Sequence, residues 1–369
     1  IVTGLVGSEM CIRDRTSTHW GTYYTEVKEG QLVGMHPFGE DADPSDIGKG
    51  LVGTLDAPTR ITAPMVRKGW LDGCTGQRGK DSFVEFSWSD ALSLVADELS
   101  RVKAERGNQS IFAGCYGWAS AGRFHHAQSQ IHRFMNCIGG YVKSVNTYSF
   151  AAAEVIIPHV LGDFRGFIYD QTSWQSICDE GGLFVGFGGL PLKNAQINQG
   201  GTGGHVQKGF VAAAHHAGVE FVNISPLAAD MPDAVKADWL AIRPNTDTAL
   251  ILGLCYTLLD EGLQDADFLD RCCSGFDIFD AYLRGTVDGR TKSADWAATI
   301  CGLPADDIRD LARRMARTRT MISLSWSLTR QAYGEQPMWA GIVLAAMLGQ
   351  IGLPGGGFGI GYSAVNRVG

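Results

Sequence analysis

The fold is decided by the stretch Leu183-Phe184-Val185-Gly186-Phe187-Gly188-Gly189-Leu190-Pro191-Leu192-Lys193-Asn194. Its first part is a short apolar run that predicts a buried strand, and the two glycines after it indicate a tight turn. Glycines let a backbone approach a phosphate closely, and Lys193 supplies a positive charge. An ordinary turn with a solvated lysine is the alternative, and the residues alone leave both interpretations open.

Strands and helices alternate on both sides of this stretch. We expect further strands over residues 110–114, 219–224 and 320–325. We expect helices over residues 88–106, 122–138, 203–217, 247–261, 304–318 and 336–351. This alternation predicts an α/β fold with mainly parallel, Rossmann-like sheets flanked by helices. The proline- and turn-rich segment 16–85 predicts a small, irregular, β-rich lobe at the N-terminal side.

Length and composition limit the class of protein. A chain of 369 residues exceeds what one hydrophobic core usually serves, which predicts several lobes. The formal charge is −8 and no lysine- or arginine-rich block occurs, so we expect no nucleic-acid partner. No run of 18 apolar residues is present, which predicts no transmembrane segment. The nine cysteines have no zinc or iron–sulfur spacing, and their odd number argues against a disulfide scaffold.

Ligands of parallel α/β sheets bind beyond the carboxyl ends of the strands. The residues that follow the expected strands are therefore candidate site residues: Tyr116-Gly117-Trp118, Lys193-Asn194, Ser225, and Trp326-Ser327 with Arg330. Thr246 and Asp247 open a further helix. Asp247 is placed as a cap or first-turn acid, which the helix dipole favours, and equally as an acceptor for two N–H groups of a guanine.

Ser149 lies where an extended approach meets an alanine-rich helix. Serine is a preferred N-cap residue, so in isolation Ser149 is interpreted as a cap. The unusual loop that holds Tyr116 and Trp118 precedes it by about 30 residues. Taken together, these segments suggest a serine oxygen held against a metal, with the tyrosine and the tryptophan directed at the same point.

Six motifs recur here in the order and spacing of a known family: Tyr116-Gly117-Trp118, Tyr148-Ser149 with Ala152-Ala153 and Pro158-His159, Pro191-Leu192-Lys193, Asn245-Thr246-Asp247, Gly334-Glu335-Gln336 and the glycine-rich segment 348–357. Over residues 18–363 the chain resembles the dimethyl sulfoxide reductase family of molybdoenzymes. Within that family it is most similar to the trimethylamine-N-oxide and biotin sulfoxide reductase branch.

The resemblance implies a molybdenum ion held by two molybdopterin guanine dinucleotides. It makes Ser149 the protein ligand of the metal, and it directs the donors of Trp118 and Tyr116 at the oxygen being transferred. It also implies residues that hold the pterin and dinucleotide arms: Gly117, Lys193, Asn194, Ser225, Thr246, Asp247, Trp326, Ser327 and Arg330. The N-terminal region Thr18-His19-Trp20-Gly21-Thr22 has no cysteine, so no iron–sulfur cluster is expected.

The activity implied is transfer of an oxygen atom from an S-oxide or N-oxide to reduced molybdenum. Trimethylamine N-oxide, dimethyl sulfoxide, and biotin or methionine sulfoxide remain open as substrates. An external donor, such as a c-type cytochrome or a cytoplasmic reductase, would return two electrons. We expect a periplasmic location, with the cytoplasm as the alternative.

The resemblance also predicts how the chain is divided. Residues 1–15 look like a non-native, adapter-like segment, and residues 16–85 form the β-rich lobe. An α/β lobe over 86–180 carries the metal ligand, residues 181–330 form a Rossmann-like lobe for the pterin dinucleotide, and 331–369 return to the first α/β lobe. The family continues with a C-terminal domain that completes the second pterin site, so we expect this chain to be an incomplete piece.

Two other classes compete with this interpretation. An NAD-dependent α/β dehydrogenase requires a glycine fingerprint after its first strand, and Tyr116-Gly117-Trp118 is not one. The second is a non-catalytic, nucleotide-binding fragment, which the content of molybdenum and pterin in the purified protein would distinguish from the reductase.

Overall fold

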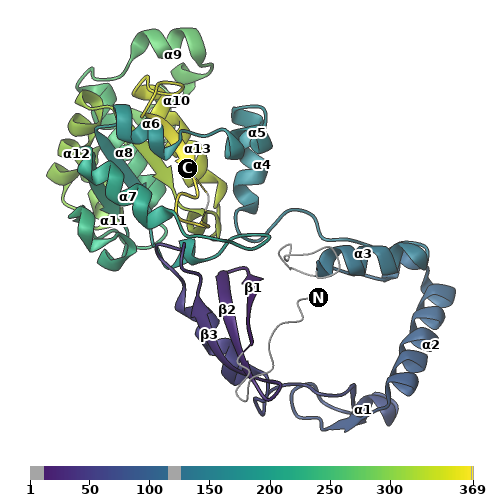
Figure 1. Ribbon diagram of the computed structural model, residues 1–369. Helices are drawn as coiled ribbons and strands as arrows, with labels where there is room; N and C mark the ends of the chain where they lie inside the picture. Colours follow the sequence, from purple (N-terminus) through teal and green to yellow (C-terminus); the bar gives the residue numbers. More distant parts are fainter. Residues whose placement is uncertain (1–11, 115–125, 367, 369) are drawn as a thin grey trace. The chain divides into compact units, whose positions relative to one another are not determined.

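The computed structural model describes residues 12–114, 126–366 and 368, and it divides into two compact units (Figure 1). Unit 1 comprises residues 1–39, 45–145 and 199–203. Unit 2 comprises residues 40–44, 146–198 and 204–369.

Unit 1 contains a three-stranded antiparallel sheet of β1 (Ile12–Thr18), β2 (Gly21–Lys28) and β3 (Gln31–Pro37). Tyr23 on β2 is 1% exposed, and its hydroxyl donates to the carbonyl of Ser45 at 2.8 Å. A second pair, β4 (Met65–Arg67) and β5 (Phe83–Glu85), is also antiparallel. The predicted β-rich character of the N-terminal side is confirmed by these small antiparallel sheets. The predicted lobe bounds of 16–85 stay a prediction. The sheet begins at Ile12, within the segment that was set aside as adapter-like.

The helices in the described part of unit 1 are η1 (Asp46–Thr54), α1 (Lys68–Leu71), α2 (Trp88–Arg106), η2 (Asn108–Ser110) and α3 (Ala127–Cys137). Helix α2 has the predicted bounds. Ser87 occupies its N-cap position, where the serine oxygen accepts the N–H of Asp90 at 3.1 Å. This bond satisfies one of the amides that have no partner in the first helical turn.

The predicted strand over residues 110–114 is wrong. Only an isolated parallel bridge between Phe112 and Val142 forms there. Ile111 and Ala113 are buried at 7% exposure, but Phe112 between them is 67% exposed. The segment thus has one buried face rather than two. Alternate residues of this apolar run face the interior and the solvent, whereas a central parallel strand is buried on both faces.

Unit 2 is built on five parallel strands: β6 (Leu183–Phe187), β7 (Glu220–Ile224), β8 (Asp238–Leu240), β9 (Thr320–Leu324) and β10 (Gly357–Ile360). Their spatial order is β10-β9-β6-β7-β8. The strand predicted from the opening stretch is β6, whose five residues are all buried at the centre of the sheet. The predicted α/β class, with a parallel sheet flanked by helices, is confirmed.

Fourteen helical segments belong to the described part of unit 2. The α-helices are α4 (Ala151–Val160), α5 (Phe164–Tyr169), α6 (Trp174–Glu180), α7 (Gln207–His216), α8 (Asp247–Asp260), α9 (Ala266–Cys272), α10 (Phe276–Leu283), α11 (Ala294–Cys301), α12 (Ala305–Arg317) and α13 (Glu335–Met347). Short 3-10 turns are η4 (Asn194–Gln196), η5 (Ala228–Asp230), η6 (Asp233–Val235) and η7 (Trp326–Thr329).

Helices cover both faces of this sheet (Figure 1). Leu183 and Val185 of β6 belong to one apolar core, which includes residues of α8, α12 and α13. Phe184 points to the opposite face and joins a second core with Trp174 of α6 and Val211 of α7. Alternate side chains of one strand therefore enter two cores, as the period of two along a strand requires. In the described part of the chain, no helix has the length and hydropathy needed to cross a bilayer.

Candidate functional site

The strand order creates a switch point at β6. The chain continues from β6 through β7 to β8 on one side, and later returns to β9 and β10 on the other. Ligands of such open sheets bind in the crevice beyond the carboxyl ends of the strands at this point. The sequence-predicted residues follow four of these strands: Lys193 and Asn194 after β6, Ser225 after β7, Thr246 and Asp247 after β8, and Trp326, Ser327 and Arg330 after β9.

The turn after β6 packs closely against the segments that follow β7 and β9. Gly188 and Gly189 have φ values of 85° and 69°, in the left-handed region that favours glycine. A Cβ atom on Gly188 would lie 2.5 Å from Cβ of Ser325, which follows β9. A Cβ atom on Gly189 would collide with the carbonyl oxygen of Asp230, which lies beyond β7. The two glycines therefore allow the β7 and β9 exits to approach the β6 exit closely.

Asp230 joins the β6 and β7 exits, and sequence reasoning missed it. The Ser225 hydroxyl donates to the Asp230 carboxylate at 2.6 Å, and Nζ of Lys193 lies 3.7 Å from the other carboxylate oxygen. The Leu190 N–H donates to the Asp230 carbonyl at 2.6 Å. The Lys193 side chain is 71% exposed, so this ion pair contributes at most about 1 kcal/mol and leaves the lysine able to change partner. The sequence signal for Asp230 is that it is an acidic residue in the segment after β7, the second strand of a Rossmann-type unit.

Asp247 is the first residue of α8, and it is 4% exposed. Burial raises the pKa of its carboxyl group to about 6, and a hydrogen bond with its own backbone N–H opposes this shift. The N-cap position belongs to Thr246, whose hydroxyl donates to the Arg243 carbonyl at 2.7 Å and makes no cap bond. Asp247 is therefore a first-turn acid, as predicted, but not the N-cap itself.

Ser149 is not the N-cap of α4, so the cap interpretation is wrong. Phe150 holds that position, and no side chain caps the helix. The Phe150 ring packs against Trp326 at a centroid distance of 4.5 Å. The Ser149 carbonyl accepts hydrogen bonds from Nε of Arg330 at 3.1 Å and from Oγ1 of Thr329 at 3.4 Å. The structure thus brings the predicted metal ligand to the exit of β9.

The other predicted residues of these exits are placed as follows. Nε1 of Trp326 is buried and has no hydrogen-bond partner among the described residues. Its indole lies so close to Gly361, beyond β10, that a Cβ atom there would overlap the ring. The Ser327 hydroxyl lies 2.9 Å from that of Ser325. Asn194 is exposed and begins η4, where its N–H donates to the Pro191 carbonyl at 2.9 Å.

Three predicted residues, Tyr116, Gly117 and Trp118, lie outside the described residues. Within the ranges that the structure does describe, no group of three or more histidine, cysteine or acidic side chains is arranged to hold a metal ion.

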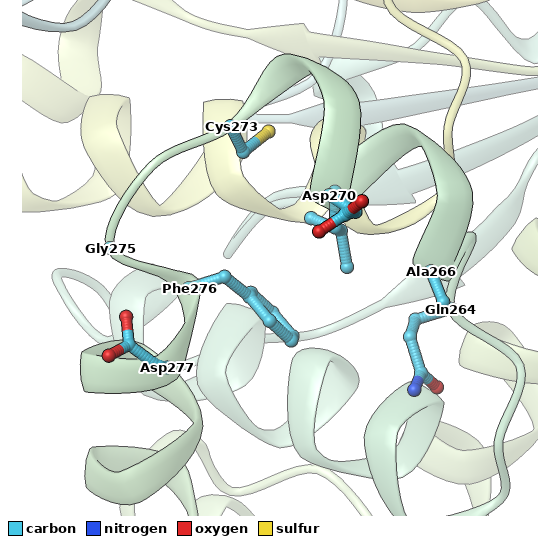
Figure 2. Close-up of a pocket in the computed structure, with 8 residues that line it drawn as sticks. Gln264, Ala266, Asp270, Cys273, Gly275, Phe276 and Asp277 are labelled. Carbon is cyan, nitrogen blue, oxygen red and sulfur yellow. The ribbon is translucent and has the colours of Figure 1, made fainter.

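Two surface hollows of unit 2 lie away from these strand exits. Figure 2 shows the first, which has a volume of about 490 Å³ and is lined by residues of α9 and α10 and the segments before them, including Gln264, Asp270, Cys273, Phe276 and Asp277. The second, of about 510 Å³, lies beside α12 and the start of β8. Neither lining contains a predicted site residue.

Known proteins match the chain along most of its length. The family model described as molybdopterin oxidoreductase matches residues 60–367, and that of the molybdopterin oxidoreductase N-terminal domain matches residues 16–55. A biotin sulfoxide reductase of Cereibacter sphaeroides is 46% identical over 341 residues, 91% of this chain and 46% of that protein. A dimethyl sulfoxide/trimethylamine N-oxide reductase of the same organism is 42% identical over 94% of this chain and 43% of that protein.

More distant comparisons agree. A trimethylamine-N-oxide reductase of Haemophilus influenzae is 40% identical over 95% of this chain and 43% of that protein. The solved structure of acetylene hydratase from Pelobacter acetylenicus has a TM-score of 0.62 at 21% identity, covering 91% of this chain and 44% of that one, which shows a shared fold. The chain spans less than half the length of these curated relatives. The resemblance stated from the motifs is confirmed: the chain belongs to the molybdopterin oxidoreductase family.

Proposed function

We propose that the whole protein is a molybdenum-dependent reductase of S-oxides or N-oxides. The observation that carries this proposal is identity of 40–46% to three proteins named as biotin sulfoxide, dimethyl sulfoxide/trimethylamine N-oxide and trimethylamine-N-oxide reductases. Dimethyl sulfoxide, trimethylamine N-oxide, and biotin or methionine sulfoxide are the candidate substrates. The same likeness disfavours an NAD-dependent dehydrogenase and a purely non-catalytic fragment.

The strand exits of unit 2 fit a large anionic, heteroaromatic cofactor of the molybdopterin guanine dinucleotide type. Lys193 and Arg330 supply positive charge for its phosphates or pterin oxygens. The Asp247 carboxylate is an acceptor for N–H groups such as those of a guanine edge. The buried, unpartnered Nε1 of Trp326 marks a polar group near the β9 exit that the described residues do not satisfy. We propose that residues 181–330 hold one such dinucleotide.

When bound, the cofactor supplies a metal that accepts an oxygen atom and cycles two electrons. The chain's own contribution is to place donors around it. Ser149 offers a hard oxygen ligand, which suits an oxidised metal better than a thiolate does. By family likeness, Trp118 and Tyr116 direct an N–H and an O–H at the substrate oxygen, where they would stabilise charge that develops during transfer.

Three further features belong to the same proposal. The absence of cysteine near Thr18–Thr22 favours molybdenum as the sole redox centre, without an iron–sulfur cluster. Electrons would then come from an external donor, either a c-type cytochrome or a cytoplasmic reductase. The matching locations are the periplasm and, alternatively, the cytoplasm.

The test is Ser149→Ala in the full-length protein, with molybdenum, pterin and turnover of each candidate oxide measured together. We expect turnover to fall by about 100-fold or more, because a ligand of the reacting metal is lost. Ser87→Ala is the matched control, since it removes a helix cap in unit 1 and should cost about 1 kcal/mol of stability without affecting turnover. Unchanged metal content and turnover in Ser149→Ala would remove Ser149 as the metal ligand, whereas a parent protein that holds no molybdenum or reduces none of the candidate oxides would refute the proposed function.

A further inference from the structure

We propose that Arg330 is a positioning residue for Ser149, and that it couples the Ser149 loop to an oxyanion bound at the β9 exit. This inference rests on the proposed function, in which Ser149 is the metal ligand. The two residues are separated by 181 positions in the sequence, but Nε of Arg330 donates to the Ser149 carbonyl at 3.1 Å. Both residues belong to unit 2.

The backbone around Ser149 is held by hydrogen bonds on both sides. Its carbonyl accepts from Arg330 and, at 3.4 Å, from the hydroxyl of Thr329, while its N–H donates to the Thr147 hydroxyl at 3.3 Å. The Thr329 hydroxyl also donates to the Trp326 carbonyl at the shorter distance of 2.8 Å. Since a hydroxyl has one proton, Arg330 is the principal donor to Ser149.

Packing fixes the helix after Ser149 but not the loop before it. Ala153 and Ile157 of α4 have no solvent exposure, and Phe150 packs between Trp326 and Phe164 at centroid distances of 4.5 and 5.6 Å. In contrast, Tyr148 is 84% exposed. The position of Ser149 relative to the β9 exit therefore depends on hydrogen bonds more than on burial: those of its carbonyl on one side, and on the other the Thr147 N–H, which donates to the Glu154 carboxylate of α4 at 3.0 Å.

Arginine can serve a second partner at the same time. Its planar guanidinium carries five N–H donors, and Nε accounts for one. The terminal nitrogens Nη1 and Nη2 of Arg330 have no recorded partner in the described chain, and the side chain is exposed. With Nε fixed on Ser149, these two nitrogens are held in one plane and can bind an oxyanion in a bidentate manner. An anion bound there would stiffen the Ser149 loop, and a fixed loop would pre-orient Arg330 for the anion.

The experiment compares Arg330→Lys, Arg330→Gln and Ser149→Ala in the full-length protein, with Arg271→Lys as control. Arg271 is an exposed arginine on α9 that pairs with Asp267. Lysine keeps the charge but loses the planar fork, whereas glutamine keeps an N–H donor and loses the charge. The readouts are molybdenum and pterin content, the paramagnetic resonance spectrum of the metal, hydrogen exchange of residues 146–150, and kcat and KM separately.

We expect Arg330→Lys to retain metal and pterin, to raise exchange in residues 146–150 by about 10-fold or more, and to alter the resonance spectrum, because the flexible ammonium lacks the planar fork that holds the Ser149 carbonyl and an oxyanion together. Its kcat should fall by about 10- to 100-fold at a KM within about 2-fold of the parent, with partial recovery in Arg330→Gln. Arg271→Lys should match the parent in every readout.

Two outcomes would overturn the inference. The first is an unchanged spectrum and unchanged exchange in both Arg330 variants while Ser149→Ala alters the spectrum, and this outcome leaves the proposed function standing. The second is loss of the cofactor from Arg330→Lys with unchanged exchange at residues 146–150, which would make Arg330 a binding residue only. An unchanged spectrum in Ser149→Ala would refute the ligand assignment on which this inference rests, whereas absence of molybdenum and pterin from the parent protein would refute the proposed function itself.

Discussion

Asp41 and His205 form a buried hydrogen-bonded pair across 164 residues of sequence, with 2.7 Å between Oδ2 of Asp41 and Nδ1 of His205. Their side chains are 1% and 2% exposed. The His205 N–H donates to the other carboxylate oxygen of Asp41 at 2.9 Å, and Nε2 of the histidine lies 3.0 Å from the Gln196 carbonyl. The pair ties the segment Glu40–Pro44 to the rest of unit 2.

Replacing one carboxylate oxygen of Asp41 by an amide nitrogen leaves a buried hydrogen-bonding group without its partner. We therefore predict that Asp41→Asn lowers the free energy of unfolding by about 1–3 kcal/mol. Urea denaturation followed by circular dichroism measures this change. Asp46→Asn is the control, because Asp46 pairs with Lys49 at the surface with 84% of its side chain exposed, and it should cost less than about 1 kcal/mol. Equal losses in the two variants would contradict the prediction.

The raised pKa of Asp247 predicts a pH dependence of stability. The folded pKa of about 6 exceeds the ordinary value of 3.8, so the folded state binds more protons than the unfolded state between these two values. The stabilisation from the protonated carboxyl is complete below about pH 4 and is lost as the pH rises through about 6. Asp247→Asn should therefore flatten this part of the stability curve and raise stability at pH 7 by about 2 kcal/mol in protein without cofactor.

The same substitution should act in the opposite direction on ligand binding. An asparagine offers one acceptor oxygen and no charge, so affinity for a guanine nucleotide should fall by about 10-fold or more if Asp247 receives the guanine N–H groups. Calorimetric titration with GDP measures it. A variant that gains stability but binds GDP as well as the parent would remove Asp247 from the guanine site.

These findings show what local sequence can predict and what it cannot. Strand β6 was predictable because all five of its residues are buried, which requires an uninterrupted apolar run. Helix α2 was predictable from its cap at Ser87. Strands β8 and β10 were not, because β8 has only three residues and β10 alternates glycine with Phe358 and Ile360.

The candidate site residues also divide into those that local sequence can indicate and those that depend on the order of the strands. Residues directly after a predicted strand, such as Ser225 and Trp326, could be named as candidates because position along one strand is a local property. Asp230 and Thr329 were missed because their roles come from the order of strands, which places the β7 exit beside β6 and brings Ser149 to β9. No spacing within one segment encodes those pairings.

The close approach at the β6 exit gives a steric prediction for Gly189→Ala. Two penalties add there: a positive φ of 69°, and a Cβ atom that meets the Asp230 carbonyl. Gly30→Ala is the matched control, since its φ of 79° carries the first penalty but no atom lies within 4 Å of its Cβ position. We expect Gly30→Ala to cost about 1 kcal/mol and Gly189→Ala about 2–4 kcal/mol in urea denaturation. Equal costs would mean that the β6 turn can move away from Asp230.

The pair of the exposed Lys193 and the largely buried Asp230 predicts competition between the carboxylate and a bound phosphate. Lys193→Gln should weaken binding of GDP by about 10-fold and reduce its dependence on salt, because one cation is removed from the anion site. Asp230→Asn should have the reverse effect on affinity, since the lysine loses its protein partner at 3.7 Å. The stability of Asp230→Asn should fall, because the asparagine amide no longer offers the Ser225 hydroxyl a charged acceptor at 2.6 Å.

Lys208→Gln is the control for Lys193→Gln, as Lys208 is similarly exposed at 62% and pairs with Asp43 outside the strand exits. If Lys193→Gln and Lys208→Gln weaken GDP binding equally, the effect comes from general surface charge and not from a phosphate site at the β6 turn.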